Sequence, residues 1–342
     1  MHWWQKIWQR LRWSKYFVIL GCLLFLGLHS CTQNTVEIVL VSNSVTKTAY
    51  QQITDKFADQ WRKDHQQTVI FSQSYGSSGA QTRSVIAGLE ADVVALALEP
   101  DVNKIQAAKI RDMPLIQPGW QKEFPGGSIV SKSVVALVTQ PGNPQQIKSW
   151  ADLLRPGLKI VTTNPKTSGA ARWIFLALWN GLDNPTEAKM QQVYQNSVVL
   201  AKDARESSDV FFKQGQGDVL LTYENEAILI AKKGEKLDYL SPPLNISIDL
   251  PVAIVDANVD KHGNRAVVEA FVKYLFEPTA QQEFAKVGFR SILPAVQKEF
   301  AQQYQPVTNA ANVQKLGGWP VIQKQFFADN AMFDRIERNL KK

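Results

Sequence analysis

Cysteine and histidine are scarce in this chain, and their scarcity excludes several kinds of chemistry. Among 342 residues there are two cysteines, Cys22 and Cys31, and both lie in or directly after an N-terminal apolar segment. The rest of the chain can form neither a disulfide nor a cysteine-ligated metal site. Beyond residue 30 the histidines are His65 and His262, which leaves few bases to activate a nucleophile. We therefore expect no cofactor and no metal.

A strong net charge is also missing once the N-terminal segment is set aside. The formal charge is +7, but Lys6, Arg10, Arg12 and Lys15 supply four of the 38 basic residues, which leaves 34 against 31 acidic ones. These charges are interspersed along the sequence. A nucleic-acid-binding protein concentrates its lysine and arginine on one surface. We therefore expect no nucleic-acid partner.

A run of transmembrane length is the third absence. The apolar run of residues 16–28 is far shorter than the roughly 20 residues that a membrane-spanning helix needs. Preceded by basic residues, it makes residues 1–30 typical of a secretion signal. Leu28-His29-Ser30-Cys31 then resembles the cleavage motif of bacterial lipoproteins, which predicts a lipid on Cys31 and a periplasmic protein anchored to the inner membrane. Ordinary cleavage near Ser30, giving a soluble protein, is the alternative.

Alternating strand and helix patterns predict an α/β protein with largely parallel sheets. The chain length suits two lobes. Strands are expected at residues 36–42, 68–74, 92–97, 133–138, 158–163, 218–223 and 250–255. Helices are expected at residues 46–65, 80–89, 170–179, 208–214, 224–232, 265–276, 279–287 and 320–339. The chain is expected to cross between lobes near Val138 and Pro251. This places residues 31–138 and 251–342 in the first lobe and residues 139–250 in the second.

Four loops between a predicted strand and a predicted helix share the features of an anion site. They contain residues 43–44, 75–79, 167–170 and 204–208, which offer small side chains, hydroxyls and backbone N–H groups. In open α/β sheets, ligands lie beyond the carboxyl ends of the strands. The first N–H groups of a helix have no internal partner and lie at its positive end. Each hydrogen bond to a charged group contributes about 1.5–3 kcal/mol, so converging loops could hold a dianion without lysine or arginine.

The loop of residues 164–169 carries this pattern most clearly. Ser168 is expected to cap the following helix, and Gly169 to permit a close approach to the backbone. Taken alone, the loop could equally be a plain capped helix. The neighbouring Arg172 and Arg205 are expected to bind carbonyl groups or nearby acids rather than the anion, and Trp173 to pack in the core.

With these features the chain resembles the periplasmic sulfate- and thiosulfate-binding proteins of ABC transporters. The resemblance covers nearly everything after residue 30. It rests on residues 73–79, 90–94, 142–144, 164–169, 171–173, 217–220, 224–227 and 317–319. It implies a two-lobe periplasmic-binding-protein fold of type II. Each lobe would be a mostly parallel sheet flanked by helices, with the ligand in the cleft between the lobes.

The resemblance also implies a set of ligand-binding residues. The family's sulfate contacts map onto Ser44, Ser78, Ser168, Gly169, Ala170, Ala204 and Tyr223. The family pattern has Asp at Ser44 and Gly at Ala170, where the contact is a backbone N–H, and Trp at Tyr223. An indole only donates, whereas a phenol donates and accepts. The choice between sulfate and thiosulfate therefore stays open.

The expected function is capture of sulfate outside the cytoplasm and its delivery to an ABC-type sulfate permease. The protein would be a monomer without enzymatic activity, bound to the membrane only through a lipid. Thiosulfate, molybdate or phosphate is the alternative ligand, although a site for protonated phosphate benefits from a carboxylate acceptor. A structural surface protein and a serine hydrolase are weaker alternatives. Gly76-Ser77-Ser78-Gly79 is not a G-x-S-x-G motif and lacks an evident base.

Overall fold

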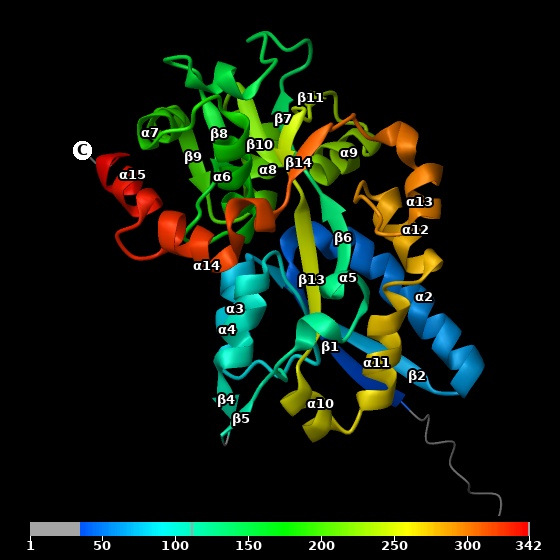
Figure 1. The fold of residues 1–342 in the computed structure, drawn as a ribbon. Coiled ribbons are helices and arrows are strands. Elements are labelled where there is room, and N and C mark those ends of the chain that lie inside the picture. Colours follow the sequence, from blue (N-terminus) through cyan, green and yellow to red (C-terminus); the bar gives the residue numbers. More distant parts are fainter. Residues whose placement is uncertain (1–34, 111, 341–342) are drawn as a thin grey trace, which may run out of the picture.

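Two α/β lobes stacked on each other make up the molecule (Figure 1). The computed structural model describes residues 35–110 and 112–340. The sheet of the first lobe has the order β2 (Thr68–Gly76), β1 (Thr35–Asn43), β3 (Val93–Ala95), β13 (Ile248–Ile254) and β6 (Ile129–Ser133). The sheet of the second lobe has the order β11 (Asp238–Leu240), β7 (Val135–Thr139), β10 (Val219–Tyr223), β8 (Ile160–Thr163) and β9 (Ser197–Ala201). These sheets confirm the predicted α/β class.

Helices flank both sheets. Those of the first lobe are α2 (Lys47–His65), α3 (Ser78–Ile86), α4 (Glu99–Ala107), α5 (Pro125–Ser128), α10 (Asp256–His262), α11 (Arg265–Tyr274), α12 (Pro278–Lys286) and α13 (Pro294–Glu299). Those of the second lobe are α6 (Gly169–Gly181), α7 (Glu187–Gln195), α8 (Ala204–Lys213) and α9 (Glu224–Lys232). A C-terminal segment adds α14 (Gly318–Ile322), the π-helical turn η6 (Gln323–Phe327) and α15 (Met332–Leu340). Within the described ranges, no helix combines the length and the apolar character needed to cross a bilayer.

Short elements complete the chain. Single 3-10 turns are η1 (Ser44–Thr46), η2 (Trp120–Lys122), η3 (Trp150–Leu154), η4 (Ala301–Gln303) and η5 (Val313–Leu316). Two small ladders join β12 (Leu244–Ile246) to β14 (Asn309–Ala311), and β4 (Lys109–Ile110) to β5 (Met113–Pro114).

The sheets are mixed rather than mostly parallel, which corrects the sequence prediction. β1 pairs in parallel with β2 and β3, and β8 pairs in parallel with β9 and β10. β13 runs antiparallel to β3 and β6, and β7 runs antiparallel to β10 and β11. The antiparallel strands β7 and β13 are the first strands that the chain forms after each crossing between the lobes. β13 and its partner β6 lie side by side in the middle of the molecule (Figure 1). The parallel strands of each lobe point their carboxyl ends toward the other lobe. A strand that enters the sheet from the other lobe begins at that edge, and it therefore runs in the opposite direction.

The crossing between the lobes lies at Val134, where the sequence predicted one uninterrupted strand of residues 133–138. β6 ends in the first sheet at Ser133, and β7 begins in the second sheet at Val135. The return crossing lies at Ser247, between β12 and β13. Both positions precede the expected ones near Val138 and Pro251. β7 is buried along its whole length, whereas β6 is only partly buried. The hydrophobic pattern does not reveal the change of sheet, because the buried Val134 continues the apolar run of β7.

The C-terminal segment packs on the second lobe, whereas the sequence prediction assigned all of residues 251–342 to the first. Phe326 and Phe327 each place their rings 5.3 Å from the ring of Phe175 in α6. Phe333 of α15 lies 5.3 Å from Tyr194 of α7. The expected helix of residues 320–339 is broken between η6 and α15. Burial of these aromatic rings accounts for the position of the segment.

Candidate anion-binding site

The predicted ligand residues lie at the carboxyl ends of parallel strands in both lobes. Ser44 follows β1 directly, and Ser78 opens α3 just after β2. In the second lobe, Ser168 precedes α6, Ala204 opens α8 and Tyr223 ends β10. Ser78, Ser168, Ala204 and Tyr223 are at most 3% exposed, and Ala170 is 7% exposed. The topology thus places the predicted residues where ligands of open α/β sheets bind.

The two lobes touch through the loops that hold Ser78 and Gly169. A Cβ atom added to Gly169 would lie 2.8 Å from Cβ of Ala97 and 3.2 Å from Cβ of Ser78. Next to this contact, the indole N–H of Trp173 donates to the carbonyl of Ala97 across the lobes, at 2.7 Å. A glycine is required at position 169 because any side chain would hold the loops apart.

The start of α6 agrees with the sequence prediction. Ser168 adopts an extended backbone, and its Oγ accepts a hydrogen bond from the N–H of Ala171 at 3.4 Å. This confirms Ser168 as the N-cap of the helix. The N–H groups of Gly169 and Ala170 have no partner inside the helix, because the first turn offers none. They remain donors at the positive end of α6.

The helix α8 begins at Ala204, four residues before the predicted start near Ser208. Its N-cap is Asp203, whose carboxylate accepts from the N–H groups of Arg205 at 2.9 Å and Glu206 at 3.1 Å. Sequence reasoning missed Asp203. The signal was present, because an aspartate followed three residues later by glutamate is a common N-terminal pattern of helices.

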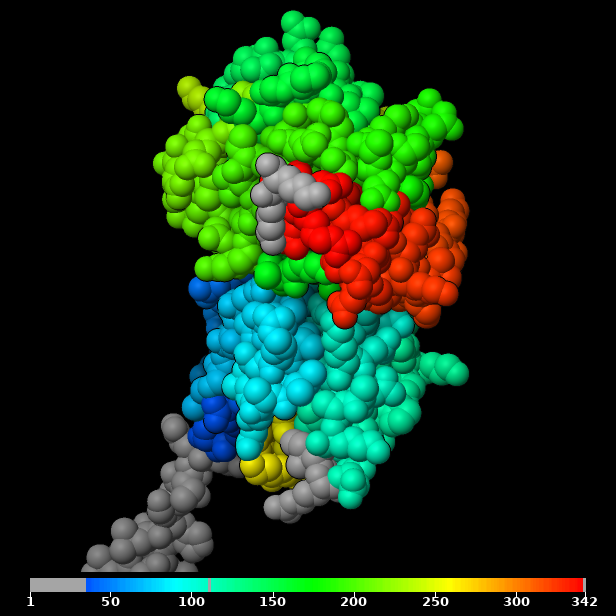
Figure 2. All heavy atoms as spheres, turned by 90° about the vertical axis from the view of Figure 1, so that its left-hand side faces the viewer, coloured from blue at the N-terminus to red at the C-terminus, as the bar shows by residue number. Residues whose placement is uncertain are grey.

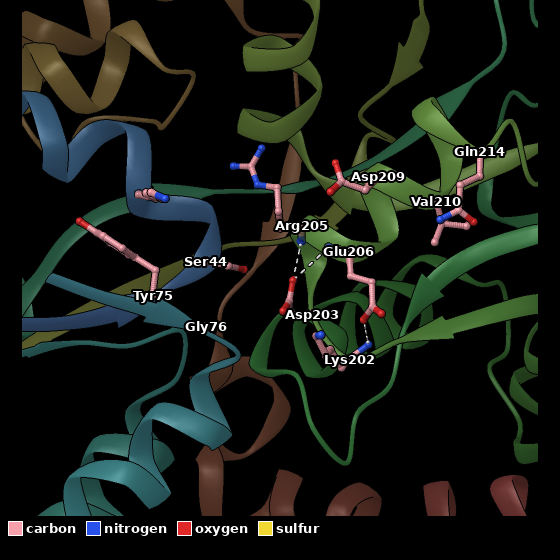
Figure 3. Close-up of a pocket in the computed structure, with 11 residues that line it drawn as sticks. Ser44, Tyr75, Gly76, Lys202, Asp203, Arg205, Glu206, Asp209, Val210 and Gln214 are labelled. Atoms are coloured by element: carbon pink, nitrogen blue, oxygen red, sulfur yellow. Dashed lines mark hydrogen bonds between the residues drawn. The ribbon is translucent and has the colours of Figure 1, made fainter. Parts of the chain in front are cut away.

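A cavity of about 490 Å³ separates the lobes beside Ser44. We call it the Ser44 cavity. In Figure 3, Ser44, Tyr75 and Gly76 come from the first lobe and face side chains on and before α8 of the second. Its charged residues are Lys47, Lys202, Arg205, Asp203, Glu206 and Asp209, three cations and three carboxylates. The Ser44 cavity is thus balanced in charge.

A second cavity, of about 220 Å³, borders Ser168 and Gly169. We call it the Arg83 cavity. Its charged residues are Arg83, Lys104, Lys166, Arg172 and Asp101, four cations and one carboxylate. The two cavities share no lining residue. Of the predicted ligand residues, Ser44 borders the first cavity, and Ser168 and Gly169 border the second. Ser78, Ala170, Ala204 and Tyr223 line neither of these two cavities.

Tyr223 is fully buried, and its hydroxyl has no hydrogen-bond partner among the described residues. Burial raises the pKa of this phenol well above its ordinary value of 10, so the group stays protonated and able to donate. An unpaired buried polar group destabilises a protein by about 1–3 kcal/mol. Thr163 at the end of the adjacent strand β8 also has a buried, unpartnered hydroxyl.

The hydroxyl of Ser78 is already engaged within the protein. It donates to Oδ2 of Asp101 at 2.7 Å and accepts from the N–H of Ala97 at 3.1 Å. Sequence reasoning did not find Asp101, which lies 23 residues further along the chain. The structure therefore leaves Ser78 its backbone N–H, at the start of α3, as the group that can bind an anion.

Arg172 and Arg205 have the supporting contacts that the sequence predicted. Arg172 donates to the carbonyl of Pro165 at 3.1 Å, and Arg205 donates to Glu226 at 3.3 Å. Glu226 is fully buried, and this burial raises its pKa to about 7 against the opposing charge of Arg205. Both arginines therefore stabilise the loops around the site through protein groups.

Comparison with known proteins identifies the family. The sequence profile of the bacterial extracellular solute-binding proteins matches residues 38–290. The chain belongs to this family.

Relatives of this solute-binding protein match most of its length. A sulfate-binding protein of Synechococcus elongatus is 55% identical over 310 residues, which cover 89% of this chain and 87% of the relative. A sulfate-binding protein of Synechocystis is 48% identical over 314 residues, covering 90% and 88%. The structure of a sulfate-binding protein from Mycobacterium tuberculosis matches with a TM-score of 0.76 at 31% identity, covering 86% of this chain and all of the other. These matches confirm the resemblance seen in the sequence and the two-lobe fold.

Family membership also indicates the class of protein and its location. Members are extracellular solute-binding proteins rather than enzymes, and their place is outside the cytoplasm. In this solute-binding protein the histidines lie elsewhere: His65 stacks on Trp61 at 3.8 Å, and His262 binds Asp92 at 2.7 Å. Among the described residues, no group of three or more His, Cys, Asp or Glu side chains could hold a metal ion. The serine-hydrolase alternative is therefore not retained.

Proposed function

We propose that this protein captures sulfate between its two lobes and delivers it to an ABC-type sulfate permease in the membrane. The observation that carries the proposal is the hydroxyl of Tyr223, a buried donor without an acceptor at the carboxyl edge of the second sheet. A bound oxyanion would supply that acceptor. The sulfate-binding names of the similar proteins support the same ligand.

The proposed contacts are neutral donors from both lobes. They are the backbone N–H groups of Ser44, Ser78, Gly169, Ala170 and Ala204 and the hydroxyls of Ser168 and Tyr223. Ser168 accepts from Ala171 and still has its own hydrogen to donate. Each of the seven donors would contribute about 1.5–3 kcal/mol net to holding the dianion. None is a carboxylate acceptor, so the set favours fully ionised sulfate over protonated phosphate.

We further propose that the lobes close on the ligand as two bodies. The first lobe would comprise the β2-β1-β3-β13-β6 sheet with α2–α5 and α10–α13. The second would comprise the other five-stranded sheet with α6–α9 and the C-terminal segment. This division modifies the boundaries 31–138, 139–250 and 251–342 by the crossings at Val134 and Ser247 and by the packing of the C-terminal segment. The contact of Gly169 with Ser78 is that of a closed arrangement.

Calorimetric titration tests the proposal. The purified protein is titrated with sulfate, thiosulfate, molybdate and phosphate, and we expect tight binding of sulfate and weaker binding of the other three. Small-angle scattering of the same samples should indicate a monomer that becomes more compact with sulfate and then fits the closed arrangement described here.

Two results would contradict the proposal. Tighter binding of thiosulfate than of sulfate would change the assigned ligand. No heat with any of the four anions would exclude an oxyanion-binding role. Identical scattering profiles with and without sulfate would separately exclude closure of the lobes.

We also propose that residues 1–30 direct export and that Cys31 carries a lipid anchoring the protein to the inner membrane. Cys31 lies outside the described residues, and the support is the sequence Leu28-His29-Ser30-Cys31 after a short apolar run. In membrane fractionation, the native protein should sediment with membranes and the Cys31→Ala variant should not. Equal membrane retention of the two forms would contradict the lipid anchor.

A further inference from the structure

The Ser44 cavity and the Arg83 cavity, both at the boundary between the lobes, differ in the charge of the residues that line them. The Ser44 cavity has equal numbers of cations and carboxylates, whereas the Arg83 cavity has four cations and one carboxylate. Figure 2 looks onto the side of the molecule where α3 and α4, drawn in cyan, meet the C-terminal helices, drawn in red. Clefts lined by charge of one sign concentrate the opposite ion and raise association rates.

Most of the charged groups of the Arg83 cavity are already paired within the protein. Arg172 donates to the carbonyl of Pro165 and to Gln323, and Lys166 pairs with Asp334 of α15. Lys104 lies 3.4 Å from Asp101 and is 53% exposed. Direct binding of an anion by these cations would break the hydrogen bonds and ion pairs that they form within the protein. Their positive charge still contributes to the electrostatic potential in the cavity.

Arg83 differs from the other three cations. Its side chain is exposed, and its guanidinium forms no ion pair or hydrogen bond with another described residue. Its Nη1 would lie 3.5 Å from a Cβ atom on Gly79, which places the guanidinium over the residue that follows Ser78. An unpaired cation at this position contacts solvent on one side and the start of α3 on the other.

We propose that the Arg83 cavity is the entry site for the oxyanion, where a dianion first binds transiently before it reaches the buried donors. The inference rests on the proposed function. Arg83 attracts the incoming anion, with Lys104, Lys166 and Arg172 adding to the field. None of the four belongs to the proposed donor set. The Ser44 cavity, with its balanced charges, is not the route of entry.

Stopped-flow tryptophan fluorescence with sulfate tests this entry site. Trp173 bonds to Ala97 across the lobes and therefore reports closure. At about 10 mM ionic strength, Arg83→Gln should lower the association rate constant about threefold and Arg83→Glu about tenfold, because charges on the order of 10 Å apart interact across water. The dissociation rate constant should stay unchanged. At about 1 M salt, the variants should match the native protein, because screening then acts over about 3 Å.

Lys47→Gln and Lys47→Glu provide the matched control. Lys47 is an exposed cation of the Ser44 cavity, so these variants change the net charge equally at the other cavity. We expect little change in their association rates. The entry site would be overturned if the Lys47 and Arg83 variants slowed association equally, or if Arg83→Glu did not slow it. The proposed function would still stand in that case, provided that the native protein binds sulfate. A native protein that binds no anion in calorimetry would overturn both.

Discussion

Replacement of Tyr223 by phenylalanine should weaken sulfate binding about ten- to more than a hundredfold while leaving the ligand-free protein equally or more stable. The first effect follows from the loss of one hydrogen bond to a charged ligand, about 1.5–3 kcal/mol. The second follows because the hydroxyl is buried without a partner in the protein, so its removal relieves an unsatisfied polar group. Calorimetry measures the affinity, and urea unfolding without sulfate measures the stability.

Tyr194→Phe is the control for this experiment. Tyr194 lies in the same lobe, is 2% exposed and also has an unpartnered hydroxyl, but it packs between Phe175 and Phe333. Its replacement should increase stability to a similar degree and leave sulfate affinity unchanged. Tyr223→Trp should retain part of the binding, since an indole N–H can donate, although the larger ring strains the closed site. If Tyr223→Phe binds sulfate as tightly as the native protein, the donor role of Tyr223 is wrong.

Replacement of Arg290 by methionine should destabilise the protein by about 3–5 kcal/mol, the range found when a buried carboxylate loses its partner. Arg290 belongs to the first lobe and donates to Glu224 of the second through Nε at 2.7 Å and Nη2 at 3.0 Å. Glu224 is fully buried. Its N–H donates to the carbonyl of Val134, the crossing residue, at 2.9 Å. The ion pair therefore joins the lobes at the hinge, next to Tyr223.

Urea unfolding measures this effect as a lower transition midpoint. Arg335→Met is the matched control, because Arg335 forms a similar two-pronged pair with Glu187 at 2.7 Å but is 44% exposed. An exposed pair contributes about 0–1 kcal/mol, so the control should change little. Adding Glu224→Gln to Arg290→Met should recover part of the stability, because it removes the unpaired charge. If Arg290→Met costs no more than Arg335→Met, the hinge pair does not stabilise the native state.

Features that depend on residues close together in the chain could be predicted. The cap at Ser168, the helix after it and the strand before it follow from apolar periodicity and hydroxyl chemistry within about ten residues. The position of the proposed anion-binding loops at the carboxyl ends of strands follows from the alternation of strands and helices. Family motifs spread along the chain were enough to identify the solute-binding protein. The N-cap at Asp203 is also a feature that depends on neighbouring residues, although the sequence prediction overlooked it.

Features that depend on distant residues could not be predicted. Arg290 and Glu224 are 66 positions apart, and Ser78 and Asp101 are 23 apart, so no local pattern pairs them. The change of sheet at Val134 could not be read from the sequence, because Val134 is itself a buried apolar residue that continues the run of β7. The aromatic residues of the C-terminal segment indicated burial without indicating which lobe would bury them. The unpaired hydroxyl of Tyr223 is likewise a property of its surroundings, since a partner is present or absent only after the lobes have folded together.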